Sequence, residues 1–96
     1  MAASAQRSVS IAIRAPLRRE DLPGLFGRTC ALLAASASDE LRCEVAGIDA
    51  DAVAVDALAR LALAARRSHC LVRLCGASQD LRMLVEFAGL EDVLRP

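Results

Sequence analysis

One histidine and four cysteines are the side chains best suited to nucleophilic or metal chemistry in this sequence. The cysteines follow the spacing C-x12-C-x26-C-x4-C, at Cys30, Cys43, Cys70 and Cys75. This spacing contains no tight C-x-x-C pair, which is the mark of a structural zinc site. His69 and Cys70 are adjacent in a stretch that alternates like a β-strand, so their side chains should point to opposite faces. Adjacency therefore cannot make them a Cys–His dyad, and we expect Cys43 and Cys70 to be buried, reduced thiols.

The carboxylates Asp49, Asp51 and Asp56 cluster before and within the start of a predicted helix. A favourable interaction with the helix dipole, worth about 0.3–1 kcal/mol each, accounts for them. A calcium or magnesium site would need more oxygen ligands than this loop offers. The G-x-x-G of Gly24–Gly27 lacks the Lys and Ser/Thr of a phosphate-binding loop. The sequence thus predicts a protein that is not an enzyme and that holds neither a cofactor nor a metal.

Length and charge narrow the class of protein further. The chain has 96 residues, with 12 basic residues, all Arg, balanced by 12 Asp and Glu. This size predicts a flexible N-terminus over residues 1–7 and a single domain over residues 8–96. Zero net charge argues against nucleic-acid binding. No apolar leader or spanning segment is evident, so we expect a cytoplasmic protein without direct membrane insertion.

Hydrophobic periodicity divides the chain into three strands and three helices. Alternation with a period of two predicts strands over residues 8–14, 41–45 and 69–75. Helical spacing predicts a helix from an N-cap at Asp21 to about residue 35, a second over about 53–67 and a third after Ser78. The apolar stripe of the second helix is Leu58, Leu61, Ala62 and Ala65, and that of the third is Leu81, Leu84, Val85 and Ala88. Gly89 should end the third helix, after which Leu90, Val93 and Leu94 should fold back onto the core.

The order of these elements, β-α-β-α-β-α, predicts an α/β fold with largely parallel strands and right-handed crossovers. Each predicted strand has one apolar and one more polar face, whereas a sheet covered on both sides would show continuous apolar strands. We therefore expect a small sheet with its helices mainly on one face.

Several segments together resemble the STAS domains, the family of anti-sigma-factor antagonists. The run 53–67 looks like the helix after that family's regulatory loop, and the segments 72–78, 81–85 and 88–94 are similar to its closing strand, helix and Gly-Leu ending. Residues 16–25 resemble the entry to the first helix in the short actinobacterial branch. The resemblance covers roughly residues 9–95 and implies a small mixed sheet with helices that binds other proteins.

In the best-known members of that family a loop motif, Asp-Ser-Ser/Thr-Gly-Leu, ends at the helix N-terminus, and its first Ser is phosphorylated. Matching the motif's Leu to Leu58 puts Ala57 at the Gly, Asp56 at the second hydroxyl, Val55 at the phosphoacceptor and Ala54 at the Asp. Valine cannot accept phosphate, and no hydroxyl side chain lies between Asp39 and Arg67. The partner-binding residues implied by this match are Asp49, Asp51, Val55, Asp56, Ala57 and Arg60.

The resemblance implies a protein partner, which would be an anti-sigma factor or a kinase-like protein. The alternative within the same fold is an accessory subunit of a phospholipid-transport ABC ATPase. A small enzyme or ligand-binding domain is the alternative of another class. A neighbouring gene for a kinase-like anti-sigma factor would favour the first role, and one for an ABC-type ATPase would favour the second.

Overall fold

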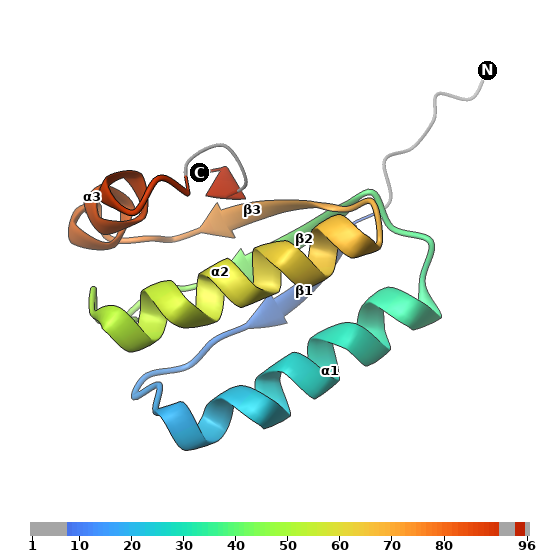
Figure 1. Cartoon of the computed structure of the whole chain (residues 1–96), viewed down its shortest axis with the longest axis horizontal. Helices are drawn as coiled ribbons and strands as arrows, with labels where there is room; N and C mark the ends of the chain where they lie inside the picture. The colour runs from blue at the N-terminus through green and yellow to red at the C-terminus, as the bar shows by residue number, and fades with distance from the viewer. Residues whose placement is uncertain (1–7, 91–93, 96) are drawn as a thin grey trace.

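Four strands form one sheet with the spatial order β1-β2-β3-β4 in the computed structural model, which describes residues 8–90 and 94–95 (Figure 1). The elements in chain order are β1 (Ser8–Ala12), the 3₁₀ turn η1 (Arg19–Asp21), α1 (Leu22–Ala35), β2 (Glu40–Glu44), α2 (Ala52–Arg67), β3 (Leu71–Cys75), α3 (Gln79–Phe87) and β4 (Leu94–Arg95). Each strand pairs in parallel with its neighbour, Ser8 opposite Glu40 and Glu40 opposite Leu71.

The predicted α/β fold and its β-α-β-α-β-α order are confirmed. Because the sheet grows in one direction, right-handed crossovers bring the connecting helices to the same side, and Figure 1 shows α1 and α2 lying across one face. The resemblance implied a mixed sheet, but all strand pairs among the described residues are parallel. The short strand β4 was not predicted. The predicted flexible segment 1–7 and Val93 fall outside the described residues.

The core lies between the sheet and these helices. The side chains of Leu41 and Cys43 in β2 and of Val45 directly after it are at most 1% exposed, as the alternation over residues 41–45 predicted. The predicted stripe of α2 is entirely buried. In α3 the prediction holds for Leu81 and Val85, whereas Leu84 is half-buried and Ala88, beyond the last turn, is exposed.

The opposite face of the sheet carries charged side chains, together with the exposed Leu71 of β3. Glu40 accepts a hydrogen bond from Arg73 Nε at 3.0 Å, and Arg42 Nε lies 3.9 Å from the same carboxylate. The Glu40–Arg73 pair joins β2 to β3, whereas Glu40 and Arg42 lie two residues apart on β2. Both pairs suit a surface in contact with water. The prediction of a one-sided sheet is therefore confirmed from the exposed side as well.

Side-chain caps start two of the three helices. Asp51 accepts a hydrogen bond from Ala54 N at 2.9 Å at the start of α2, and Ser78 accepts one from Leu81 N at 3.1 Å at the start of α3. Asp21 occupies the predicted position before α1, but its carboxylate accepts from Arg18 N at 3.0 Å and makes no cap with the helix. The predicted capping role of Asp21 is wrong because the preceding 3₁₀ turn already runs into the helix.

The C-terminal ends of α2 and α3 share one hydrogen-bond motif. In α3, Gly89 N donates to Glu86 O and Leu90 N donates to Val85 O, both at 3.0 Å, with Gly89 at φ +76°. In α2 the corresponding donors are His69 and Cys70, and His69 has φ +59°. This is the Schellman motif, whose left-handed residue is usually glycine. His69 was predicted to begin the third strand, but it lies in this turn, exposed to solvent.

Replacing His69 with Gly should stabilise the protein. A left-handed backbone costs a residue with a Cβ about 1–2 kcal/mol, and glycine's greater freedom in the unfolded chain offsets part of the gain. We expect His69→Gly to raise the free energy of unfolding by about 0.5–1 kcal/mol in urea denaturation. The reverse variant in the matching motif, Gly89→His, should lower it by a similar amount, since a Cβ at Gly89 meets no atom within 4 Å. Equal stability of both variants and the wild type would contradict this role for His69.

Candidate functional site

The predicted site residues lie at the edge of the sheet where the parallel strands end. The chain leaves β2 through residues 45–51 and enters α2, and it leaves β1 through residues 13–18 and enters η1. Two backbone hydrogen bonds of 2.9 Å, Ile13 N to Glu44 O and Val45 N to Cys75 O, extend the strand pairing up to this edge. In α/β sheets, binding sites usually form at this edge, because the connections there carry the variable side chains.

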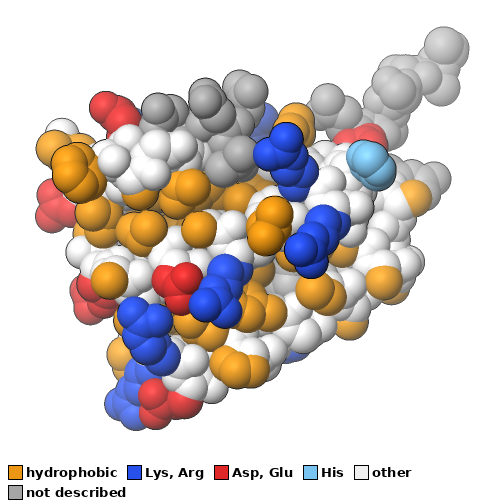
Figure 2. All heavy atoms as spheres, in the orientation of Figure 1, with side chains coloured by type: hydrophobic (Ala, Val, Ile, Leu, Met, Phe, Trp, Pro, Cys, Tyr) orange, Lys and Arg blue, Asp and Glu red, His pale blue; other side chains and the backbone are white. Residues whose placement is uncertain are grey.

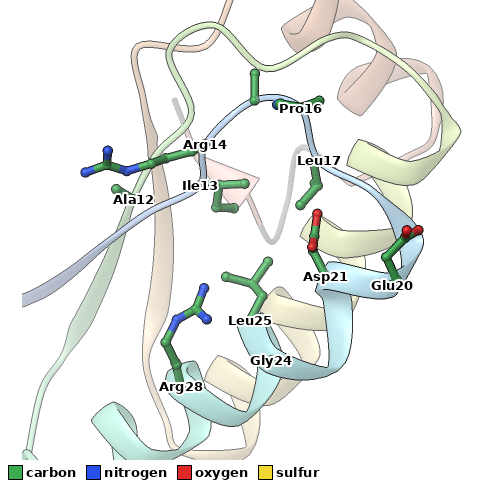
Figure 3. A pocket seen from close by; sticks show the side chains of 11 residues that line it. Ala12, Ile13, Arg14, Pro16, Leu17, Glu20, Asp21, Gly24, Leu25 and Arg28 are labelled. Carbon is green, nitrogen blue, oxygen red and sulfur yellow. The ribbon is translucent and has the colours of Figure 1, made fainter.

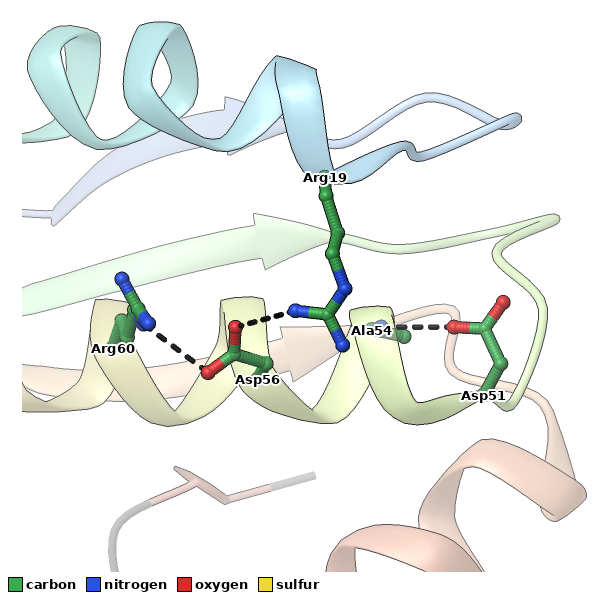
Figure 4. Close-up of polar contacts among 5 residues, drawn as sticks. All are labelled: Arg19, Asp51, Ala54, Asp56 and Arg60. Atoms are coloured by element: carbon green, nitrogen blue, oxygen red, sulfur yellow. Dashed lines mark hydrogen bonds and ion pairs between the residues drawn. The ribbon is translucent and has the colours of Figure 1, made fainter.

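Asp56 is the centre of a charge network on the first turns of α2 (Figure 4). Its carboxylate accepts a hydrogen bond from Arg60 Nε at 3.1 Å and one from Arg19 Nη1 at 3.4 Å. The Arg60 pair is the i, i+4 pair that helix spacing makes possible. Arg19 comes from η1, and nothing in the sequence pattern indicated its contact with a residue 37 positions away. The network therefore joins two elements that are distant in the sequence.

Phe26 extends this network onto α1. The guanidinium of Arg60 lies 5.8 Å from the centroid of the Phe26 ring, within the range of a cation–π contact. Both arginine side chains are more than 60% exposed, and that of Asp56 is 30% exposed. The charges are thus held in place by their neighbours and are still open to a partner. We call Arg19, Asp56 and Arg60 the α2 charge network.

The remaining predicted partner-binding residues differ in their access to the surface. Asp49 and Asp51 are exposed, although the Asp51 carboxylate is engaged in capping α2. Val55, the phosphoacceptor position, is half-buried. Ala57 is fully buried at 0% exposure, so its inclusion among residues that contact a partner is wrong. A residue at this point of α2 faces the sheet, and its small side chain belongs to the core.

The four cysteines occupy three kinds of environment. Cys43 and Cys70 are buried free thiols, as predicted for neighbouring strands, whereas Cys75 is half-buried and Cys30 is exposed on α1. Burial raises the pKa of Cys43 to about 12, with smaller contributions from Cys75 and Glu44. Burial, and then Asp39, also raise the pKa of Cys70, whose Sγ donates to Ser38 O at 2.7 Å. Nucleophilic catalysis needs a thiolate, so neither buried thiol is suited to it.

Thiol labelling tests these environments directly. We expect a polar maleimide to modify Cys30 of the native protein quickly and Cys43 and Cys70 only as fast as the protein unfolds, because only the exposed thiol is accessible. Peptide mapping by mass spectrometry identifies the modified residues, and labelling in denaturant provides the control in which all sites react. Fast labelling of Cys43 or Cys70 in the native protein would contradict the strand faces described above.

A hollow of about 690 Å³ lies between the end of β1 and the start of α1 (Figure 3). Its charged residues are Arg14, Arg28, Glu20 and Asp21, and the G-x-x-G segment contributes Gly24 and Leu25 but not Gly27. The Asp21 carboxylate is engaged with Arg18 N, and Arg14 extends away from the other labelled side chains. The lining contains no cysteine, histidine, serine or threonine. The lining therefore offers carboxylate and guanidinium groups but no hydroxyl, thiol or imidazole.

Two further features bear on the kind of site present. Within the described part of the chain, no three His, Cys, Asp or Glu side chains come together closely enough to hold a metal ion. None of the helices in residues 8–90 is both long and apolar enough to cross a membrane.

The sequence matches no protein-family model, and a search of curated proteins finds none that is significantly similar. The case for a function therefore rests on the geometry of the α2 charge network and its surroundings.

Proposed function

We propose that this protein is a non-enzymatic regulatory module, similar to the STAS antagonists of anti-sigma factors, that binds a partner protein at the start of α2. The observation that carries the proposal is the α2 charge network. In it the Asp56 carboxylate lies 3.1 Å from Arg60 and 3.4 Å from Arg19 on a partly exposed surface. Charges that are complementary to those of a partner give a protein interface specificity.

The fold around the network supports this proposal. A small sheet with its crossover helices on one face agrees with the sheet and helices that the STAS resemblance implies, although the described strand pairs are parallel and not mixed. The network also begins one residue after Val55, the position that the resemblance matches to the phosphoacceptor. A partner that recognises this place would meet the carboxylate of Asp56 beside a residue that cannot be phosphorylated.

A consequence of the proposal is that phosphorylation does not switch this surface. Because Val55 has no hydroxyl, we expect no phosphate on residues 48–60 when the chain is isolated from its own cells and analysed by mass spectrometry. The matched variant Val55→Ser restores an acceptor at the same place and tests whether a kinase in those cells recognises the loop. Phosphate on residues 48–60 of the wild-type chain would contradict the proposal.

Capture of the partner tests the proposal and separates its alternatives. Immobilised wild-type chain and the Asp56→Arg variant are exposed to the same extract, and proteins retained only by the wild type are identified by mass spectrometry. An anti-sigma factor or kinase-like protein in that set supports the antagonist role. An ABC-type ATPase with a lipid-binding component supports the accessory-subunit role instead. Equal retention of all proteins by the wild type and the variant would contradict binding at the start of α2.

A further inference from the structure

Helix α3 has a second apolar face that the fold does not cover. Leu81 and Val85 fill the core at 0% and 4% exposure, whereas Met83 and Phe87 on the opposite side are 60% and 89% exposed. Single exposed apolar residues are common on protein surfaces, but here two large ones follow at i, i+4 spacing and form a stripe.

This stripe borders a shallow hollow of about 430 Å³ between α3 and the loop before α2. The hollow is lined by Asp80 and by four apolar residues. We call the apolar residues, Ala50, Met83, Leu84 and Phe87, the α3 patch. Figure 2 shows apolar side chains gathered at the α3 end of the molecule, with acidic side chains at the margins. The patch is therefore a continuous feature of the surface to which two separate elements contribute.

Carboxylates dominate the surroundings of the α3 patch. Asp49 and Asp51 flank Ala50 in the loop, and Asp80 and Glu86 lie on α3, against the single positive charge of Arg82. Most of the arginine side chains visible in Figure 2 lie away from this end of the molecule. An apolar stripe with an acidic rim is complementary to an apolar stripe with a basic rim.

We propose that the α3 patch binds a basic amphipathic helix of a partner protein. This inference rests on the proposed role as a protein-binding module and adds a second contact surface beside the α2 charge network. A helix with apolar residues at i, i+3 or i+4, and i+7 places them along one side, where they can cover Met83 and Phe87. Arginine or lysine residues beside that stripe would then face Asp49 and Asp80.

Charge disfavours a second copy of this chain as the occupant. A twofold symmetric contact would place the α3 patch of one copy against the same patch of the other. The acidic rims would then face each other, and like charges across an interface oppose association. A basic helix of another protein has no such penalty.

A displayed peptide library tests the proposal with a defined probe. The library consists of 16-residue peptides with leucine or alanine at helical spacing and with arginine, lysine, glutamate or glutamine at the other positions. It is selected on the immobilised wild-type chain. We expect enrichment of peptides with a net positive charge and an apolar stripe. Failure to enrich any peptide, or enrichment of acidic or neutral peptides, would overturn the proposal.

Variants then locate the binding site of an enriched peptide by fluorescence anisotropy. We expect Phe87→Ser and Asp80→Lys each to weaken binding at least tenfold. Leu63→Ser, which removes another exposed leucine (52% exposed, on α2), should leave binding unchanged. If Phe87→Ser binds the peptide with wild-type affinity, the proposal is overturned. It is also overturned if the wild-type chain self-associates at increasing concentration and Phe87→Ser abolishes that self-association. Asp56→Arg should not change the affinity for this peptide. The proposal for the α3 patch can therefore be refuted while the proposed function stands.

Discussion

At pH 10.5 the free energy of unfolding should be about 2 kcal/mol lower than at pH 8. The reason is the buried thiol of Cys43, whose pKa rises from 9.0 to about 12 because burial disfavours the thiolate. Above pH 9 the unfolded chain releases this proton while the native protein retains it. The unfolded state is thereby favoured by about 1.4 kcal/mol for each pH unit until the native pKa is reached. Cys70, whose pKa is also raised, should add to the loss.

The composition of the chain makes this effect easy to isolate. The sequence contains no Tyr and no Lys, so neither of these residue types, whose ordinary pKa values lie near 10, contributes to the slope. Urea denaturation under reducing conditions at several pH values between 8 and 10.5 measures the slope. Cys43→Ala should remove most of it, whereas the exposed-site control Cys30→Ala should keep it. A stability that is independent of pH between 9 and 10.5 would contradict the burial of Cys43.

The regular elements of this fold could be predicted because their patterns are local. Leu41, Cys43 and Val45 alternate with charged residues, and the structure buries all three. The stripe of α2 was incomplete in the prediction, since Ala54 and Ala57 are also buried. Ala54 and Ala57 lie four residues before Leu58 and Leu61, so extending the predicted stripe by one turn toward the start of the helix would have included them. The two-residue strand β4 is too short to have a period.

The parts of the site that could not be predicted depend on contacts between distant residues. The approach of Arg19 to Asp56 requires η1 to lie beside α2, and no pattern in the sequence encodes that distance. The contact of Arg60 with Phe26 depends in the same way on the packing of α1 against α2. The turn at His69 could not be predicted either. A left-handed residue after a helix is normally recognised in a sequence because it is a glycine, and here the residue is a histidine. The alternating pattern therefore placed His69 in the strand.

Reversing the charge of Asp56 should weaken partner binding at least tenfold. At the centre of an interface, a like-charge contact costs several kcal/mol, and tenfold weaker binding corresponds to about 1.4 kcal/mol. The effect on folding should be smaller. Each exposed ion pair of Asp56 is worth about 0.2–1 kcal/mol, so losing both lowers the free energy of unfolding by about 2 kcal/mol at most. A charge-swapped variant reduces this loss further.

The double variant Asp56→Arg/Arg60→Asp is that charge swap. It keeps the net charge and an i, i+4 pair on α2 but inverts the two charges that a partner would meet. The matched control is Asp39→Arg. Asp39 is an exposed residue directly before β2, at the opposite end of the sheet from the start of α2. This control changes charge without touching the α2 charge network.

The most direct test of the account is the affinity of the captured partner for these variants, measured by isothermal titration calorimetry. We expect the double variant to bind at least tenfold more weakly than the wild type, with a free energy of unfolding within about 1 kcal/mol of the wild-type value. Asp39→Arg should bind within about twofold of the wild type, because charges far from an interface contribute little at physiological ionic strength. Wild-type affinity of the double variant would contradict binding through the start of α2.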